Sequence, residues 1–143
     1  GSCQLRDCTE YTLLNHALRN ALPVFGVCRG LQLLQQHAHG ILRRCERDVH
    51  VATVHPIPLR TDLLEFDAPG QANVNSFHQW AVPQHTLAPS LELLAASSDG
   101  CVEAVRHRAA PIAAVQGHTE REANSVQAEL DRHFLCNTLQ LGD

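Results

Sequence analysis

The stretch Pro23-Val-Phe-Gly26-Val-Cys28-Arg-Gly30-Leu-Gln32 decides the fold, because a short β-type run ends on a cysteine and passes directly into a helical pattern. A side chain presented on a tight strand-to-helix turn needs small neighbours, since a Cβ two residues before or after it would collide with the turn or the substrate. The turn also places Cys28 at a helix N-terminus, whose dipole and N–H groups favour a thiolate and a developing oxyanion. The stretch therefore predicts a nucleophile elbow.

A second interpretation of Cys28 stays open at this point. Free cysteine is among the most buried residue types, so a Gly-x-Cys-x-Gly run is also compatible with a core strand followed by an ordinary loop. The rest of the chain has to distinguish the two.

The bulk composition is that of a globular core-forming chain. The sequence has 143 residues, of which 44% are hydrophobic and 18% charged, and its formal net charge is -4. This length predicts one domain. A chain without a basic face is not expected to bind nucleic acid or an anionic membrane, so the predicted partners are small molecules or proteins.

The sequence predicts a cytoplasmic protein without cofactors. No apolar stretch approaches the roughly 20 residues that span a bilayer, and no charged-then-apolar signal pattern opens the chain. The six cysteines include no Cys-x-x-Cys pair, which predicts reduced thiols rather than a zinc knuckle or a disulfide framework. His50 and His55 would need further ligands to bind a metal, so a substrate contact or a surface position is favoured and no metal is predicted.

The first forty residues predict the order helix, strand, helix. Asp7 and Glu10 have the spacing of a capping box, and apolar residues then recur at helical spacing as far as Pro23. A strand is predicted over residues 24–27, and a second helix from Leu31 to a stop at Gly40. This order suits an α/β sheet of parallel strands.

The remaining chain adds strands and a last helix. Extended segments are predicted over residues 49–57, ending or lying at an edge because of Pro56 and Pro58, and over residues 73–77. Asp99-Gly100 is a two-residue turn signal between strands at 91–96 and 102–105, with Glu103 expected to be exposed. A buried strand is predicted over residues 111–116, and a helix over about 120–139.

A cysteine nucleophile needs a base, usually histidine, and a third group that orients the imidazole. The chain has ten histidines, and His118 follows a buried-type strand at its carboxyl end with Glu120 two residues later. Cys28 lies at a strand carboxyl end as well, where ligands gather in open parallel sheets. Cys28, His118 and Glu120 are therefore the predicted triad; the alternative is that His118 and Glu120 are solvated loop residues.

Four blocks in order resemble class I glutamine amidotransferases over about residues 7–122. They are Gly26-Val-Cys28-Arg-Gly30-Leu-Gln32, Asn75-Ser-Phe-His78, Ser98-Asp-Gly100 with Glu103-Ala104, and Gln116-Gly-His118-Thr-Glu120. The resemblance implies a flavodoxin-like α/β fold, a three-layer sandwich with a mostly parallel central sheet. It also implies that residues 1–143 form a single, partial domain of this family, truncated at its N-terminus.

Within that superfamily the chain looks most similar to the stand-alone γ-glutamyl hydrolase branch, the peptidase C26-like proteins. Three features carry this similarity: Arg29 in the elbow, the Asn75-Ser-x-His78 block and the Glu-Arg-Glu run ending at Glu122. Arg6-Asp7 with Thr9-Glu10, and the His50/His55 pair, are similar to hydrolases that act on γ-glutamyl-CDP-amidate.

The resemblance implies attack of Cys28 on a γ-glutamyl carbonyl to give a thioester that water resolves, with His118 moving protons and Glu120 orienting it. Two alternatives stay open, since Gln32 is also expected as an exposed helix residue and Asn75-Ser76 as a turn. The substrate-binding residues implied by the resemblance are Arg29, Gly30, Gln32, Asn75, Ser76, Phe77 and His78.

The chain departs from the family pattern in three places. Gly117 and Thr119 stand where a tryptophan and a proline are usual, which loosens the segment that aims His118. The N-terminal β/α units, with a loop that donates to the oxyanion, have no counterpart here. The expectation is a homo-oligomer or a separate chain that supplies this region. The other functions left open are a glutaminase subunit that delivers ammonia to a synthetase and a non-catalytic assembly module.

Overall fold

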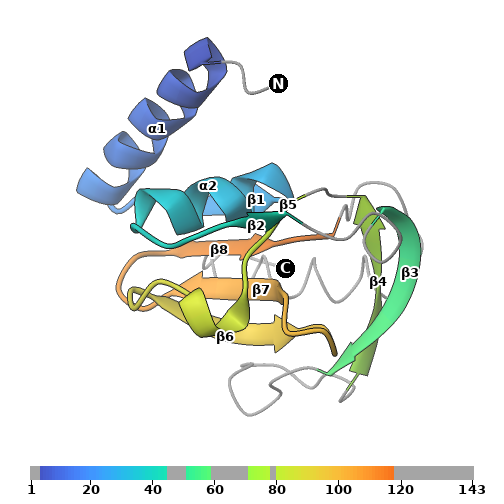
Figure 1. Cartoon of the computed structure of the whole chain (residues 1–143). Coiled ribbons are helices and arrows are strands. Elements are labelled where there is room, and N and C mark those ends of the chain that lie inside the picture. Colours follow the sequence, from blue (N-terminus) through green and yellow to red (C-terminus); the bar gives the residue numbers. More distant parts are fainter. Residues whose placement is uncertain (1–3, 45–50, 59–70, 78–79, 118–143) are drawn as a thin grey trace.

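A computed structural model describes residues 4–44, 51–58, 71–77 and 80–117 (Figure 1). Two helices, α1 (Gln4–Arg19) and α2 (Arg29–His37), alternate with strands in the first half of the described chain. The described strands are β1 (Val24–Val27), β2 (Arg43–Arg44), β3 (Val51–Pro58), β4 (Gln71–Phe77), β5 (Trp80–Ala81), β6 (Leu91–Ala96), β7 (Val102–His107) and β8 (Ile112–Val115).

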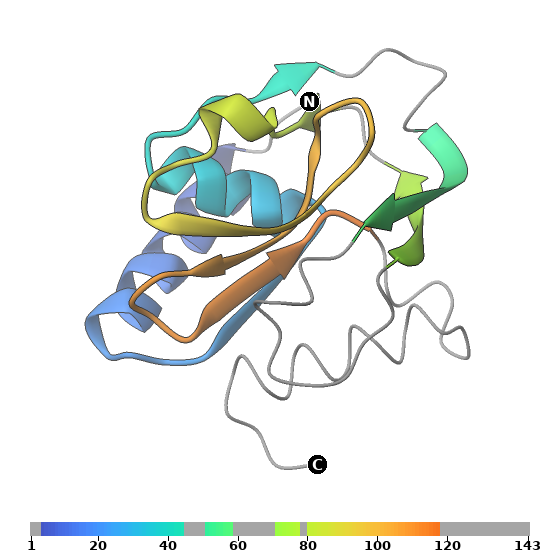
Figure 2. The same cartoon turned by 90° about the horizontal axis from the view of Figure 1, so that it is seen from below.

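The central sheet has the strand order β1-β8-β7-β6. β1 and β8 run parallel, in the register Val24↔Ile112 to Val27↔Val115, while the β8–β7 and β7–β6 pairs are antiparallel. Helix α2 lies on one face of this sheet, as Figure 2 shows from below. The predicted α/β class is thus confirmed, and the described part of the sheet is mixed.

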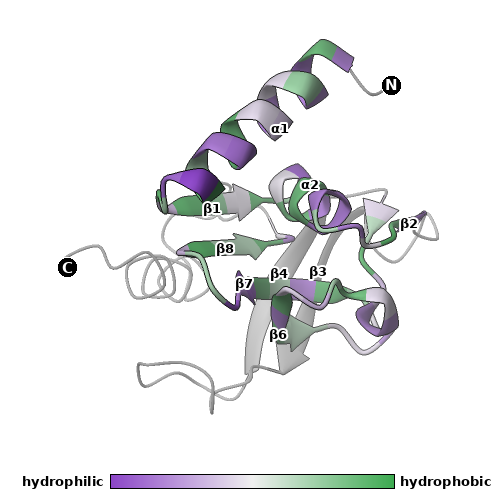
Figure 3. Ribbon diagram, turned by 90° about the vertical axis from the view of Figure 1, so that its left-hand side faces the viewer, coloured by the Kyte–Doolittle hydropathy of each residue, from purple (hydrophilic) through white to green (hydrophobic). Residues whose placement is uncertain are grey.

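The core forms on both faces of β8, because successive side chains of a strand point to opposite faces. Ile112 and Ala114 pack with Leu31 and Leu34 of α2. Ala113 and Val115 belong to a second buried cluster with Leu94. A strand buried on both sides must be apolar throughout, and β8 is uniformly hydrophobic in Figure 3.

The predicted start of the first helix is wrong. α1 begins at Gln4, so Asp7 lies inside the helix rather than at its N-cap. The Asp7 carboxylate instead contacts the guanidinium of Arg29. Asp7 and Glu10 thus share one partner, Arg29 of α2. The predicted strand over residues 24–27 is confirmed as β1, and the predicted helix over 120–139 lies outside the described residues.

The second helix ends one turn before Gly40. Its C-cap is Ala38, and His39 adopts the left-handed conformation with φ 66° that a glycine usually takes. Gly40 is needed for space, because a Cβ there would meet the side chain of Gln35. The helix thus ends before the predicted stop at Gly40, and His39 rather than Gly40 takes the left-handed position.

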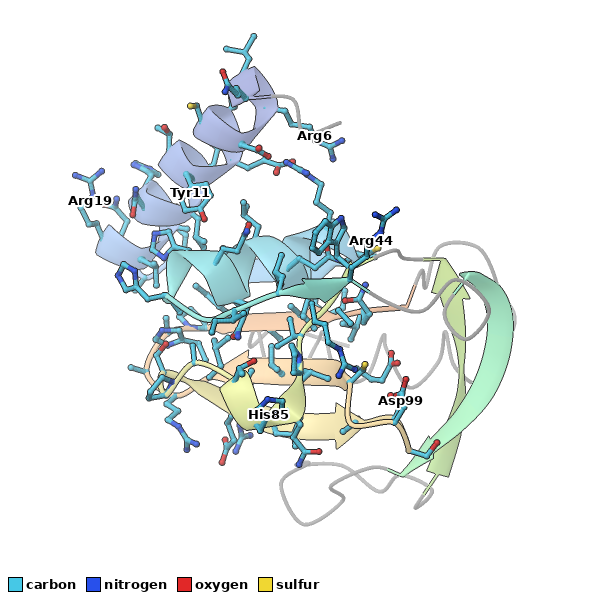
Figure 4. All side chains as sticks on the ribbon, in the orientation of Figure 1. Arg6, Tyr11, Arg19, Arg44, His85 and Asp99 are labelled. Atoms are coloured by element: carbon cyan, nitrogen blue, oxygen red, sulfur yellow. The ribbon has the colours of Figure 1, made fainter. Side chains whose placement is uncertain are left out.

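The predicted hairpin between β6 and β7 is confirmed, but its turn is longer than two residues. The amide of Ser97 donates to the carbonyl of Cys101 and the amide of Gly100 to that of Ser97, which closes a three-residue loop. Gly100 has φ 82°, the left-handed position that such loops assign to glycine. Asp99, labelled in Figure 4, lies in this loop.

The expectation that Glu103 is exposed is wrong, since its side chain is only 2% exposed. Glu103 lies on β7 where that strand meets β8, and its carbonyl accepts the amide of Gln116. Its place between two sheet neighbours, rather than any local pattern, buries it.

The other predicted strands are present as an antiparallel pair, β3 with β4. β3 ends at Pro58, as the prolines indicate, and β4 includes the predicted residues 73–77. This pair lies beyond the carboxyl ends of β1 and β8 (Figures 1 and 2). Within the described residues, neither helix has the length and apolar character needed to cross a bilayer.

Candidate active site

Cys28 occupies the turn between β1 and α2, where it is the N-cap residue of the helix with φ 52° and ψ -98°. A non-glycine residue with positive φ is strained, and such strain gathers at functional sites. The Cys28 amide donates to the carbonyl of Val115 at 2.8 Å, which ties the turn to the end of β8. This is the strand-to-helix geometry of a nucleophile elbow.

Gly26 is required by the close approach of α2 to the sheet. A Cβ at this position would lie 2.9 Å from the carbonyl carbon of Gly30 and 3.2 Å from the Cβ of Ala114. A Cβ at Gly30 would meet no described atom within 4 Å. The expected collision with the turn is therefore confirmed at Gly26 and wrong at Gly30, where a clash with substrate stays a prediction.

The N-terminus of α2 supplies a positive field at Cys28. The amides of Leu31 and Gln32 donate to the Cys28 carbonyl at 3.1 and 3.3 Å. The first turn of α2 contains no acidic residue. Since no carboxylate of that turn offsets the helix dipole, the dipole favours a negative charge on the thiol beside it.

The sequence did not single out the residue whose side chain contacts the thiol. Gln116 Nε2 donates to Cys28 Sγ at 3.4 Å, and Gln116 is fully buried. Gln32 Nε2 lies 3.5 Å from Gln116 Oε1 and donates to the Trp80 carbonyl at 2.9 Å. In the sequence, Gln116 stood out only as the last residue of the predicted strand 111–116 and the first residue of the last family block.

Arg29 connects the elbow to α1. Its guanidinium contacts the Asp7 carboxylate, and its Nε lies 3.1 Å from Glu10 Oε2. These side chains are about one third exposed, so the ion pairs are partly screened by solvent. Arg29, predicted as a substrate-binding residue, thus has a structural partner on another helix.

The predicted substrate segment lies at the same end of the sheet as Cys28. Asn75, Ser76 and Phe77 belong to β4, so the alternative that Asn75-Ser76 forms a turn is wrong. Gln32, the other residue with an open alternative, is half-buried and its amide is engaged. His78, His118 and Glu120 lie outside the described residues.

A second polar cluster lies beside the β6–β7 loop. Burial, and next the negative charge of Asp99, raise the pKa of Glu103 to about 8. Burial also raises the pKa of the Cys101 thiol, whereas Cys8 is exposed on α1. Cys101 is therefore a poor nucleophile at neutral pH. Among the described residues, no three histidine, cysteine or acidic side chains gather as metal ligands.

Comparisons with known proteins show which proteins this chain is similar to. The chain is 31% identical over 129 residues to a glutamine-hydrolysing GMP synthase subunit of Thermococcus kodakarensis, covering 89% of this chain and 67% of that protein. It is 29% identical to anthranilate synthase component 2 of Azospirillum brasilense, over 90% of this chain and 65% of that one. It is 27% identical to the γ-glutamyl-CDP-amidate hydrolase of Campylobacter jejuni, over 85% of this chain and 56% of that one.

The fold is shared with solved glutamine amidotransferases. The structure from Thermotoga maritima superposes with a TM-score of 0.66 at 17% identity, over 93% of this chain and 59% of that one. The structure from Methylobacillus flagellatus gives a TM-score of 0.64 at 18% identity, over 90% of this chain and 48% of that one. The chain thus spans about half to two thirds of these proteins. Because the family model of Peptidase C26 matches residues 2–120, the chain belongs to this class I glutamine amidotransferase-like family.

Proposed function

We propose that the chain carries the nucleophile of a γ-glutamyl-amide hydrolase and that Cys28 is this nucleophile. The observation that carries the proposal is the strained backbone of Cys28 at the N-terminus of α2. The names of its relatives support glutamine amidotransferase or amidohydrolase chemistry in general. A hydrolase-like character belongs to the family as a whole, and a γ-glutamyl amide is the substrate proposed for this chain.

In the proposed reaction, the Cys28 thiolate attacks the γ-carbonyl carbon and forms a tetrahedral oxyanion. His118 gives a proton to the departing nitrogen as the C–N bond breaks, and Glu120 orients the imidazole. A glutamyl thioester remains on Sγ. Water, deprotonated by His118, then attacks the thioester and releases glutamate and the thiolate, so that the net reaction adds one water across the amide bond.

The start of α2 is suited to hold the oxyanion. The amides of Leu31 and Gln32 donate hydrogen bonds to the Cys28 carbonyl. The donors closest to the turn are then the first two amides of the helix, those of Arg29 and Gly30. Amides at a helix N-terminus have no partner within the helix. We assign them to the developing negative charge.

The glutamyl group is proposed to bind between α2 and β4. Its α-amino and α-carboxylate groups need several polar partners beside the thiol. Asn75, Ser76 and Phe77 in β4 offer backbone groups at this end of the sheet. Gln32, one helical turn after the nucleophile, and His78 complete the proposed set, and Gly30 leaves space for the substrate.

The test is hydrolysis of γ-glutamyl-p-nitroanilide and of glutamine by the chain and by two matched variants. Cys28→Ser is expected to lose activity by a factor of at least about 10³, because serine lacks the activated thiolate. Cys8→Ser, at an exposed thiol on α1, should retain it. Activity that survives Cys28→Ser would contradict the assignment. A glutamine-analogue electrophile such as diazo-oxo-norleucine should label Cys28 stoichiometrically, and the absence of labelling would favour a non-catalytic assembly module.

A second candidate is a glutaminase subunit that passes ammonia to a synthetase chain. Two relatives bear the names of a synthase component and a synthase subunit, which favours a partner chain. This candidate predicts weak hydrolysis alone and stimulation on adding the partner. Robust hydrolysis of the bulky anilide by the isolated chain would decide for the stand-alone hydrolase. In both cases we place the reaction in the cytoplasm, where thiols such as Cys8 and Cys101 stay reduced.

A further inference from the structure

A chain of side-chain amides leads from a backbone carbonyl to the predicted nucleophile. It begins at the carbonyl of Trp80, which accepts Gln32 Nε2 at 2.9 Å. Gln32 Nε2 also lies 3.5 Å from Gln116 Oε1. Gln116 Nε2 in turn donates to Cys28 Sγ at 3.4 Å. The contacts thus join α2, β5 and the end of β8 around one sulfur atom.

The Trp80 carbonyl fixes the direction of the hydrogen bonds along this series of side-chain amides. A backbone carbonyl can only accept a hydrogen bond, so Gln32 must present its NH₂ group to Trp80. The same NH₂ group faces Gln116, which must therefore present its oxygen to Gln32. The NH₂ group of Gln116 is then left for the sulfur, and so the orientation of both amides follows from the position of Trp80.

The sheet register places Gln116 beside Cys28 without any help from the side chains. Val27 is paired with Val115 in the parallel β1–β8 ladder. Cys28 and Gln116 are the residues that directly follow these two strands. The Cys28 amide donates to the Val115 carbonyl at 2.8 Å. Gln116 is fully buried, which shields its contact with the sulfur from competing water.

We propose that Gln116 is a positioning residue for the nucleophile, whose side-chain N–H holds the Cys28 thiolate in place and stabilises its charge. The proposal rests on the proposed function of Cys28. A hydrogen bond to the charged form of a group favours that form, and a bond to an ionised acceptor is stronger than one to a neutral acceptor. The amide also restricts the sulfur to the side of the turn that faces Gln32, a residue proposed to contact substrate.

The competing interpretation is that Gln116 only fills space at the end of β8. Removing it would then change the stability of the chain and leave the ionisation of Cys28 unchanged. The pH dependence of Cys28 alkylation separates these outcomes, because it reports the thiolate population directly and requires no turnover.

The test measures the rate at which iodoacetamide alkylates Cys28, followed on the Cys28 peptide by mass spectrometry between pH 5 and 10. Gln116→Met keeps nearly the same volume and removes the donor. The midpoint of the Cys28 profile is expected to rise by about one pH unit, so that alkylation below the midpoint is about tenfold slower. An unchanged midpoint in a variant with native circular dichroism would overturn the proposal.

Gln35→Met is the matched control. Gln35 is a second fully buried glutamine, and its amide contacts the backbone of Ile41, Thr86 and Ala88 rather than the sulfur. This variant should lose stability and keep the wild-type alkylation midpoint. A shift equal to that of Gln116→Met would mean that loss of any buried amide moves the thiol, which would also overturn the proposal.

A third variant keeps the test decisive if Gln116→Met does not fold. Gln32→Met leaves Gln116 in place and removes the group that orients it, so it should raise the midpoint in the same direction by a smaller amount. An unchanged alkylation midpoint in this variant would contradict the role of Gln32 in orienting Gln116. If the alkylation midpoint shifts as expected while γ-glutamyl hydrolysis is absent, the proposed function fails and the positioning role of Gln116 stands. If the chain hydrolyses γ-glutamyl amides and the midpoints of the variants are unchanged, the proposed function stands and the positioning role fails.

Discussion

Cys28 and Gly26 show what the elbow requires at the scale of single atoms. Cys28 is held at φ 52°, a conformation that costs on the order of 1–3 kcal/mol and persists only where the surroundings enforce it. The close approach of α2 to the sheet at Gly26 is part of those surroundings. Strain at Cys28 and absence of a side chain at Gly26 are therefore two aspects of one turn.

The first prediction concerns this approach. Gly26→Ala should lower the free energy of unfolding by about 1–3 kcal/mol, because the new Cβ would overlap the backbone of Gly30, which cannot move aside as a side chain would. Gly30→Ala is the matched control, and it should keep or slightly raise stability, since alanine favours a helix. Urea denaturation of both variants measures the difference, and equal stabilities would contradict the close packing of α2 on the sheet.

The second prediction concerns the pH dependence set by Glu103. Its pKa is about 8 in the folded chain against 4.5 as the ordinary value. Between these values the folded state keeps a proton that the unfolded state has lost, so stability falls as pH rises from about 4.5 to about 8. The Glu103 contribution to this fall is on the order of 5 kcal/mol.

Glu103→Gln tests this directly, because the amide has the same shape and does not ionise. The variant should be more stable than the parent at pH 8, with a flatter profile between pH 5 and 8. Thermal or urea unfolding at several pH values measures both quantities. If the two proteins had parallel profiles, Glu103 would not be the group responsible.

At the scale of elements, the position of α1 depends on a few side chains. Its buried residues are Leu14 and Ala17, and Tyr11, labelled in Figure 4, has its ring centroid 5.5 Å from that of His37 on α2. The ion pairs of Arg29 with Asp7 and Glu10 add a polar connection from α1 to the residue after Cys28. These contacts connect α1 to the elbow.

The third prediction follows from this connection. Arg29→Met should destabilise the chain by about 1 kcal/mol or less at low ionic strength, because the pairs are partly exposed, and the loss should shrink in 0.5 M salt. Arg6→Met is the control, since the ion pair of the 63%-exposed Arg6 in the described part of the chain is with Glu10 of its own helix. Urea denaturation at two salt concentrations gives the comparison. A salt-independent loss at Arg29 would mean that packing, rather than charge, holds α1.

At the scale of the whole molecule, an apolar groove runs between α1, β1 and α2. Its volume is about 320 Å³, and its lining includes Leu13, Phe25 and Leu33. β1 is an edge strand of the described sheet. Leu13 is 62% exposed. An edge strand beside exposed apolar side chains favours association with another chain.

The fourth prediction is therefore self-association through this groove. Sedimentation velocity should show concentration-dependent assembly of the chain. Leu13→Glu should reduce assembly at little cost in stability, because it places a charge at the groove. Leu5→Glu changes a more exposed leucine of the same helix, 77% exposed, that lies outside the groove lining, and it should assemble like the parent. A chain that is monomeric at all concentrations would contradict the prediction.

Local patterns predicted the elements well, because the signals for a strand, a turn or a helix lie within a few residues. β1, the β6–β7 hairpin and the strand of residues 73–77 were all predicted from such patterns. The same patterns failed at Asp7 and Glu103. The spacing of Asp7 and Glu10 fitted a helix cap, but in the structure Asp7 pairs with Arg29 on another helix. The burial of Glu103 depends on which strands flank it.

The sequence by itself predicted that Cys28 lies on a turn between a strand and a helix, because a buried-type strand before it, a helical pattern after it and the glycine at position 26 are local features of such a turn. Only the tertiary structure decided what surrounds the sulfur. Gln116 reaches Cys28 across 88 residues of chain, and Arg29 reaches α1 rather than its own neighbours. Such contacts depend on strand order and register, which residue spacing along the chain does not encode.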